Sequence, residues 1–250
     1  MPDLRLVRAE ILKLRRRPGL MAAAGVLAFA SAVLYLVVLM VLHALDPSGH
    51  AGAGGGAHFN DAMGILGMAA PVAGVLVGAT AGGADIEAGV FRDLAATGRS
   101  RTALFAARVP GAWAIVVPLV LAAIAVCALL AVVLEGPGPA LTAHDVVSGG
   151  AAALVAAMLL TAASVGLAGL ANARGMVIGV VLAFQLGISP LVGEIGALGN
   201  ARHAIPSIAT ARIDGALADE YALGTAILVV LAWAVVTLGA GLWRTRTQEI

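Results

Sequence analysis

Six runs of about 20 residues without a charged side chain constrain this sequence more than any other feature. They lie at about 20–42, 62–82, 109–134, 146–171, 175–192 and 222–243. An apolar run of this length is long enough to cross a bilayer as a helix. Only 12% of the residues are charged, against roughly 25% in a soluble domain. The sequence therefore predicts an all-α membrane protein with six transmembrane helices, forming a single transmembrane domain over residues 1–250.

The distribution of basic residues predicts the orientation of these helices. Of the 15 Lys and Arg residues, all except Arg202 and Arg212 fall in segments on one side of the predicted bundle. The positive-inside bias places that side, and with it both termini, in the cytoplasm. Abundant Ala, Gly, Val and Arg with a single lysine is typical of a GC-rich bacterial genome, so we expect a multi-pass protein of the bacterial cytoplasmic membrane.

Residues 1–18 read as an amphipathic helix on the inner membrane surface. Leu4, Val7, Ile11 and Leu14 recur at spacings of three and four residues, which places them on one helical face. The basic residues that flank this face suit anionic headgroups. Pro18 and Gly19 predict the turn into the first span. The alternative is a basic cluster that only fixes topology.

Outside the membrane, residues 45–61 are rich in glycine and predict a flexible linker. Residues 193–221 are moderately apolar but too short to cross, so we expect a re-entrant or interfacial helical hairpin before the last span. Glycines at 74, 78 and 82, and again at 175 and 179, form ridges that predict tight helix packing. Cys127 is the sole cysteine and is expected in the core.

Several chemistries are excluded by the residues that they require. A P-loop needs G-x-x-x-x-G-K-[ST], and Lys13, the only lysine, lies between two leucines. Proton-coupled carriers need ionisable groups inside the membrane, and the six apolar runs contain no Asp, Glu, Lys, Arg or His. A zinc protease helix of the H-E-x-x-H type is also absent. We therefore expect no catalytic residue, metal or cofactor on this chain.

The segment 84–108, "ADIEAGVFRDLAATGRSRTALFAAR", interrupts two charge-free runs on the predicted cytoplasmic side. Gly89 allows a bend, the residues after it favour a short helix, and Gly98 closes that helix. Ser100 is a plausible N-cap for the helix that continues into the third span. The sequence thus predicts a helix that runs across the cytoplasmic face between spans two and three.

This short helix suits docking to a soluble partner, because one side is apolar and the other is charged. The residues expected to make the contact are Asp85, Glu87, Phe91, Arg92, Asp93, Leu94, Arg99 and Arg101. The alternative interpretation is an ordinary basic loop whose charges only fix topology.

In order and content, these features resemble the type-2 permease family of ABC transporters, the exporter class. Glu87 and Gly89 match the acidic and glycine positions of that family's coupling segment, Ser100-Arg101 match its "SR", and Arg108 matches a basic position. Val90 stands where threonine is common, and Gly98 where proline is frequent. The resemblance implies a permease that dimerises and binds two copies of a separate ATPase, which carries the ATP and Mg.

The transported compound is constrained only by the character of the spans. Sparse polar groups among Ala, Val, Leu and Gly suit an amphipathic or apolar cargo such as a drug, an antibiotic peptide or a lipid-like molecule. Thr161, Ser164 and Gln185 are candidates for a pathway, although Gln185 equally suits a hydrogen bond to a neighbouring helix. Partners are the bilayer and a second permease, identical or related, with no nucleic acid. The alternative functions are an energy-independent channel, a scaffold that docks a cytoplasmic partner, or a membrane enzyme.

Overall fold

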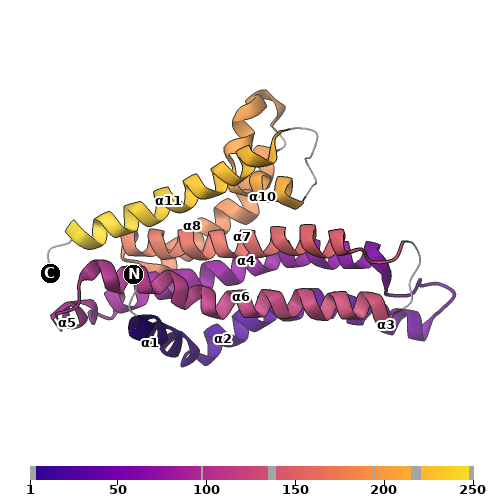
Figure 1. Cartoon of the computed structure of the whole chain (residues 1–250), viewed down its shortest axis with the longest axis horizontal. Helices are drawn as coiled ribbons and strands as arrows, with labels where there is room; N and C mark the ends of the chain where they lie inside the picture. The colour runs from indigo at the N-terminus through magenta and orange to yellow at the C-terminus, as the bar shows by residue number, and fades with distance from the viewer. Residues whose placement is uncertain (1–3, 97, 135–138, 194, 215–220, 248–250) are drawn as a thin grey trace.

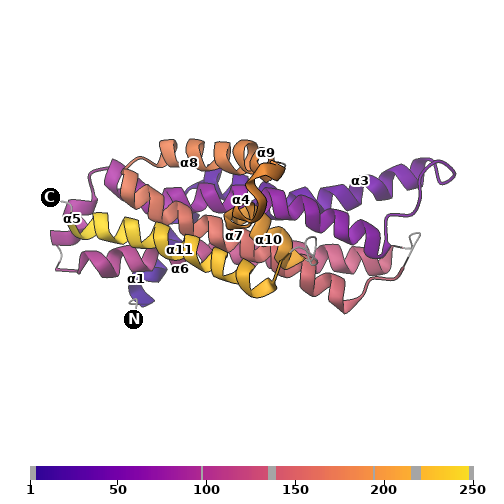
Figure 2. The same ribbon diagram turned by 90° about the horizontal axis from the view of Figure 1, so that it is seen from above.

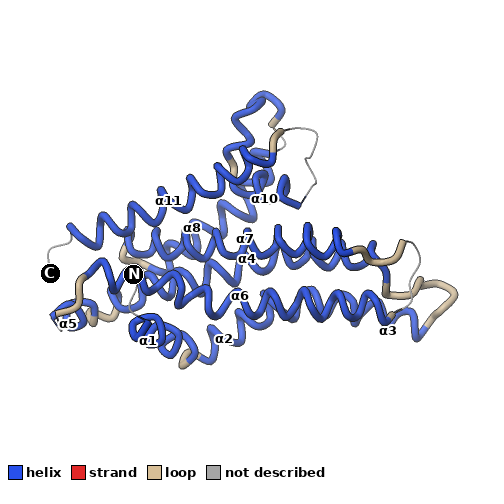
Figure 3. Tube along the Cα trace, viewed as in Figure 1, coloured by secondary structure: helices blue, strands red, loops and turns tan. Residues whose placement is uncertain are grey.

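The computed structural model describes residues 4–96, 98–134, 139–193, 195–214 and 221–247, and this part of the chain contains helices and loops but no strand (Figure 3). The α-helices are α1 (Leu4–Arg15), α2 (Pro18–Gly25), α3 (Ser31–Leu45), α4 (Gly55–Glu87), α5 (Phe91–Ala96), α6 (Arg101–Val133), α7 (Ala143–Ala171), α8 (Arg174–Leu182), α9 (Ser189–Gly193), α10 (Pro206–Asp214) and α11 (Leu223–Thr247). Two π-helical segments, η1 (Val26–Ala30) and η2 (Ala183–Ile188), and one 3-10 segment, η3 (Gly196–Ala204), join some of them.

Within the described residues, six helical segments are long and apolar enough to cross a membrane. They are Pro18–Leu45, Gly55–Glu87, Arg101–Val133, Ala143–Ala171, Arg174–Gly193 and Leu223–Thr247. The predicted all-α class with six such helices is confirmed to this extent. The side of the membrane on which each end lies stays a prediction.

The helices run further than the charge-free stretches. Helix α4 begins at Gly55 rather than near 62, and α6 begins at Arg101 rather than near 109. A 33-residue helix is about 50 Å long, whereas the hydrocarbon core is about 30 Å thick, so charged residues can occupy the ends of the same helix. The expected linker is correspondingly shorter, because Gly55–Asp61 are helical and Phe59 among them is fully buried.

Helices α4 and α7 pack side by side at the centre of the bundle (Figures 1 and 2). Their close approach depends on the predicted glycine ridge of α4. A Cβ on Gly74 would lie 2.6 Å from Thr161 Oγ1, and one on Gly82 would lie 2.5 Å from Val165 O. Small residues at such positions let two membrane helices pack backbone to backbone. The glycine ridge of α4 therefore packs against α7 of the same chain. By contrast, a Cβ on Gly175 or Gly179 of α8 would meet no atom of the described residues within 4 Å.

The first half of α11 stands away from α7, on the side where α8, η2, α9, η3 and α10 lie (Figure 1). Its second half approaches α7, and Gly241 lies against Gly166. The predicted hairpin region is helical over η3 and α10, and residues 194 and 215–220 lie outside the described part. Trp233 Nε1 donates to Ala204 O over 2.9 Å, which holds η3 against α11. Entry of this hairpin into the membrane stays a prediction.

The two ends of the described chain lie at the same end of the bundle. Helix α1, helix α5 and the last turns of α11 gather there, and the α3–α4 connection lies at the opposite end (Figures 1 and 2). Pro18 is the first residue of α2, so the turn predicted at this proline is confirmed. We call this end, which holds α1, α5, the start of α6 and the end of α11, the basic end.

Candidate functional site

The segment between α4 and α6 has the local structure that its glycines and serine predict. Gly89 and Gly98 take φ values of +71° and +82°, a region that favours glycine. They bracket the short helix α5. Ser100 caps α6, since its side chain accepts a hydrogen bond from Ala103 N over 3.2 Å. A helix thus bridges α4 and α6 at the basic end (Figure 1).

An ion pair attaches helix α1 to the end of α4. Lys13 Nζ lies 2.8 Å from Asp85 Oδ2 and 2.5 Å from Glu10 Oε2. The side chains of Lys13 and Asp85 are 23% and 12% exposed, so the pair is largely removed from solvent. Burial raises the pKa of Glu10 above its ordinary value, and the neighbouring Lys13 partly offsets this effect. Two segments separated by 72 residues are therefore held together by charge.

Arg108 extends this cluster into α6. Its side chain is 1% exposed, and Nη1 donates to Gly82 O over 2.8 Å. Nη2 lies 3.8 Å from Asp85 Oδ2, and the guanidinium carbon lies 5.2 Å from the centre of the Phe91 ring. A cation at this distance from an aromatic face is attracted to it. The charge cluster of Glu10, Lys13, Asp85 and Arg108 thus joins α1, α4 and α6, with Phe91 of α5 against it.

A second ion pair joins the last turn of α4 to the first turn of α8. Glu87 Oε2 lies 2.9 Å from Arg174 Nε, and Glu87 Oε1 accepts from Arg174 N over 2.5 Å. The carboxylate therefore also satisfies a free backbone N–H at the start of α8. This pair is more open than the first, with side chains 42% exposed for Arg174 and 32% for Glu87.

The structure separates the predicted docking residues into two groups. Asp85, Glu87 and Phe91 make the intramolecular contacts described above. Asp93 and Arg99 are exposed, and Leu94 and Arg101 are half-buried. The side chain of Arg92 lies outside the described part. A molecule that approached the basic end would meet Asp93 and Arg99 before it reached the charge cluster.

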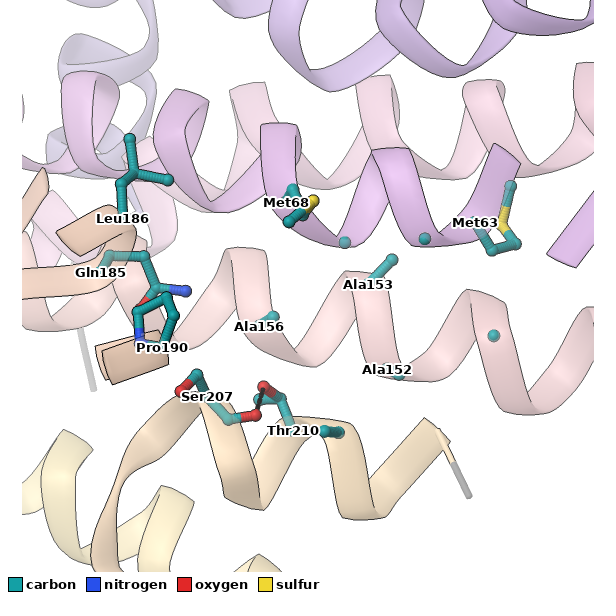
Figure 4. Close-up of a pocket in the computed structure, with 14 residues that line it drawn as sticks. Met63, Met68, Ala152, Ala153, Ala156, Gln185, Leu186, Pro190, Ser207 and Thr210 are labelled. Carbon is teal, nitrogen blue, oxygen red and sulfur yellow. Dashed lines mark hydrogen bonds between the residues drawn. The ribbon is translucent and has the colours of Figure 1, made fainter. Parts of the chain in front are cut away.

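A cavity of about 350 Å³ lies further along the bundle, between α4, α7, η2, α9 and α10 (Figure 4). Met63 and Met68 of α4 and Ala152, Ala153 and Ala156 of α7 form much of its wall. Three polar side chains also line it, Gln185 from η2 and Ser207 and Thr210 from α10. The residues that line it, all in the described part of the chain, include no ionisable group. This chemistry suits a neutral, largely apolar guest.

Only one of the three predicted pathway residues belongs to this cavity. Gln185 lines it, and in Figure 4 its side chain lies beside Pro190. Thr161 and Ser164 are fully buried at the contact of α7 with α4, where Thr161 Oγ1 donates to Ala157 O over 2.7 Å. Their small size allows the close approach of the glycine ridge.

The sequence alone did not predict the pairing of Lys13 with Asp85 or the contribution of Ser207 and Thr210 to the cavity. The one available signal for the first was that the only lysine lies three residues after Glu10, on a helix that is otherwise rich in arginine. Nothing in the sequence pointed to the second. Comparison of the chain with family models and with curated proteins finds no match in either set.

Proposed function

We propose that this chain is the permease subunit of an ATP-driven exporter similar to the type-2 ABC permeases, in the cytoplasmic membrane of a bacterium. Two copies of the permease, or this chain with a related one, assemble with two copies of a separate ATPase. That ATPase binds ATP and Mg, and the permease carries no catalytic residue of its own.

The observation that carries this proposal is the attachment of segment 84–108 to two other helices, α1 and α8, at the basic end, together with the contacts between its own parts. Asp85 is bound to α1 through Lys13, Arg108 contacts both Asp85 and Phe91, and Glu87 is bound to α8 through Arg174. A force applied to α5 would pass to α6 through the contact of Phe91 with Arg108, and the two ion pairs at the end of α4 would carry it on to α1 and α8. A passive loop that only fixed topology would need none of them.

The cavity supports a cargo that is amphipathic or apolar. Its volume of about 350 Å³ lies at the lower end of ligand pockets, which range from about 300 to 1,000 Å³. The amide of Gln185 offers hydrogen bonds to a polar group on such a molecule. The Thr210 hydroxyl donates to Ser207 O and the Ser207 hydroxyl is bound to Ser189 Oγ, and the oxygen of each hydroxyl can still accept a hydrogen bond. The lack of an ionisable group in its lining favours an uncharged guest.

Stoichiometric co-purification tests the proposal. The full chain is purified from its native membrane in mild detergent, and its partners are identified and quantified. We expect a P-loop ATPase at one copy per permease. Asp93→Lys reverses an exposed charge on α5 and should remove that ATPase. The matched control is Asp46→Lys, which reverses an exposed charge at the opposite end of the bundle and should retain it.

Two results would overturn the proposal. A chain that purifies without any ATPase favours an energy-independent channel or a scaffold. An ATPase that is lost equally from Asp93→Lys and Asp46→Lys would show that the basic end is not its docking site.

A further inference from the structure

A second hollow lies at the basic end, and the contacts described so far leave it unused. It encloses about 700 Å³ between the first turns of α6 and the last turns of α11, and it is open to the outside. Phe105, Val109 and Pro110 line it from α6, and Leu238, Gly239 and Leu242 line it from α11. We call this hollow the α6–α11 groove. Both helices are long and apolar enough to cross the membrane. Few residues of α11 are buried in the single chain.

The groove is apolar along its length and polar at one end. Ser100 and Thr102 belong to its lining, and their hydroxyl oxygens lie 3.2 Å apart. On α11, Arg246 follows Leu242 by four residues and Leu238 by eight, so all three lie on one helical face. Arg246 is exposed, one turn beyond the groove. Arg99 is exposed next to Ser100, which adds positive charge at the same end.

An apolar groove with hydroxyl groups at one end and exposed arginines just beyond that end matches the two parts of one class of molecule. A phospholipid has an apolar chain and a phosphate, and basic pockets between membrane helices bind anionic headgroups. We propose that the α6–α11 groove binds an anionic phospholipid, with an acyl chain against Gly239 and the phosphate near Arg246. Positive charge at the polar end selects an anionic headgroup over a zwitterionic one.

The glycine in the groove allows a direct test. A Cβ on Gly239 would meet nothing within 4 Å, so Gly239→Leu fills the groove without a clash inside the protein. Gly179→Leu is the matched control, because Gly179 is also open but lies on α8 outside the groove. Arg246→Gln removes the positive charge that is proposed to bind the headgroup, and it leaves the apolar wall of the groove intact.

The purified full chain is titrated with phosphatidylglycerol or phosphatidylcholine, and bound lipids are counted by native mass spectrometry. We expect the unmodified chain and Gly179→Leu to retain phosphatidylglycerol about five-fold more strongly than phosphatidylcholine, since one arginine near the surface contributes an effect of that size. Gly239→Leu should lose the tightly held lipid, and Arg246→Gln should lower the preference for phosphatidylglycerol.

The proposal is overturned if Gly239→Leu and Gly179→Leu retain lipid equally, or if the unmodified chain shows no preference for the anionic lipid. It is also overturned if Gly239→Leu abolishes a dimer while lipid retention is unchanged, because the groove is then an interface between copies. If Gly239→Leu fails to fold, Arg246→Gln decides alone. The measurement needs no ATPase, so its outcome is independent of the proposed transport function.

Discussion

Removing the positive charge of Lys13 tests whether the charge cluster holds α1 to the bundle. The Lys13→Met variant keeps a long side chain but leaves the carboxylates of Glu10 and Asp85 without the cation that lies 2.5 and 2.8 Å from them. Arg108 cannot replace it directly, since its Nη2 lies 3.8 Å from Asp85 and its Nη1 is already bound to Gly82 O.

The expected loss of stability follows from the burial of the pair. Removal of one partner from a fully buried ion pair costs about 3–5 kcal/mol. Lys13 is still 23% exposed, so solvent compensates in part, and we expect about 2–3 kcal/mol. For a chain of this size each kcal/mol lowers the Tm by about 2–4 °C, which gives a decrease of about 4–12 °C.

Thermal unfolding of the full chain in detergent measures this decrease. Arg15→Met is the matched control, because it removes one positive charge from the same helix at an exposed position, and its Tm should change by less than about 2 °C. A double-mutant cycle with Asp85→Asn should give a coupling energy of about 1 kcal/mol or more. Equal Tm values for the two single variants of α1, or purely additive effects in the cycle, would refute the reasoning.

Three further predictions concern other contacts. Gly78→Ala places a Cβ against Thr161 O and should destabilise the chain by about 1–3 kcal/mol. Gly67→Ala on the same helix places a Cβ in open space and should be neutral or stabilising. Chemical denaturation of the two variants measures both effects. Because the folded protein raises the pKa of Glu10, the stability linked to this group is present in acid and is lost as the pH rises through that raised pKa. Glu10→Gln should therefore remove this part of the pH dependence, and identical Tm–pH curves for the variant and the unmodified chain would contradict it. Arg174→Ala breaks the half-open pair with Glu87 and should lower stability by less than about 1 kcal/mol, while ATPase stimulation by the permease falls; unchanged stimulation would show that this pair does not transmit motion.

The six apolar helices were predictable because a charge-free run of about 20 residues leaves few alternatives to a membrane helix. Local signals were equally reliable, as Gly89, Gly98, Ser100 and Pro18 show, since the backbone geometry of each depends on its own neighbourhood. The ends of the helices were not predictable from hydropathy. Hydropathy marks the part of a helix that suits lipid, and the backbone hydrogen bonds of the helix continue beyond that part.

Contacts between residues far apart in the sequence could not be predicted from the sequence alone. Lys13 and Asp85 are separated by 72 residues, and neither carries a local mark of the other. A threonine or serine in an apolar run can line a pathway or allow close packing, and only the position of α4 decides the second role for Thr161 and Ser164. Gln185 differs because it lies in a π-helical segment beside a cavity whose wall α10 completes, and the sequence did not indicate that α10 lies there.

Site-directed cross-linking at α5 tests the transport proposal most directly. Cys127, the sole cysteine, is buried, so a cysteine-reactive cross-linker on Asp93→Cys reports on position 93. In native membranes, we expect this variant to cross-link to a P-loop ATPase, and we expect Asp46→Cys at the opposite end to yield no such product. Absence of the ATPase product at position 93, or equal amounts at both positions, would contradict the proposal that the basic end receives the force of an ATPase.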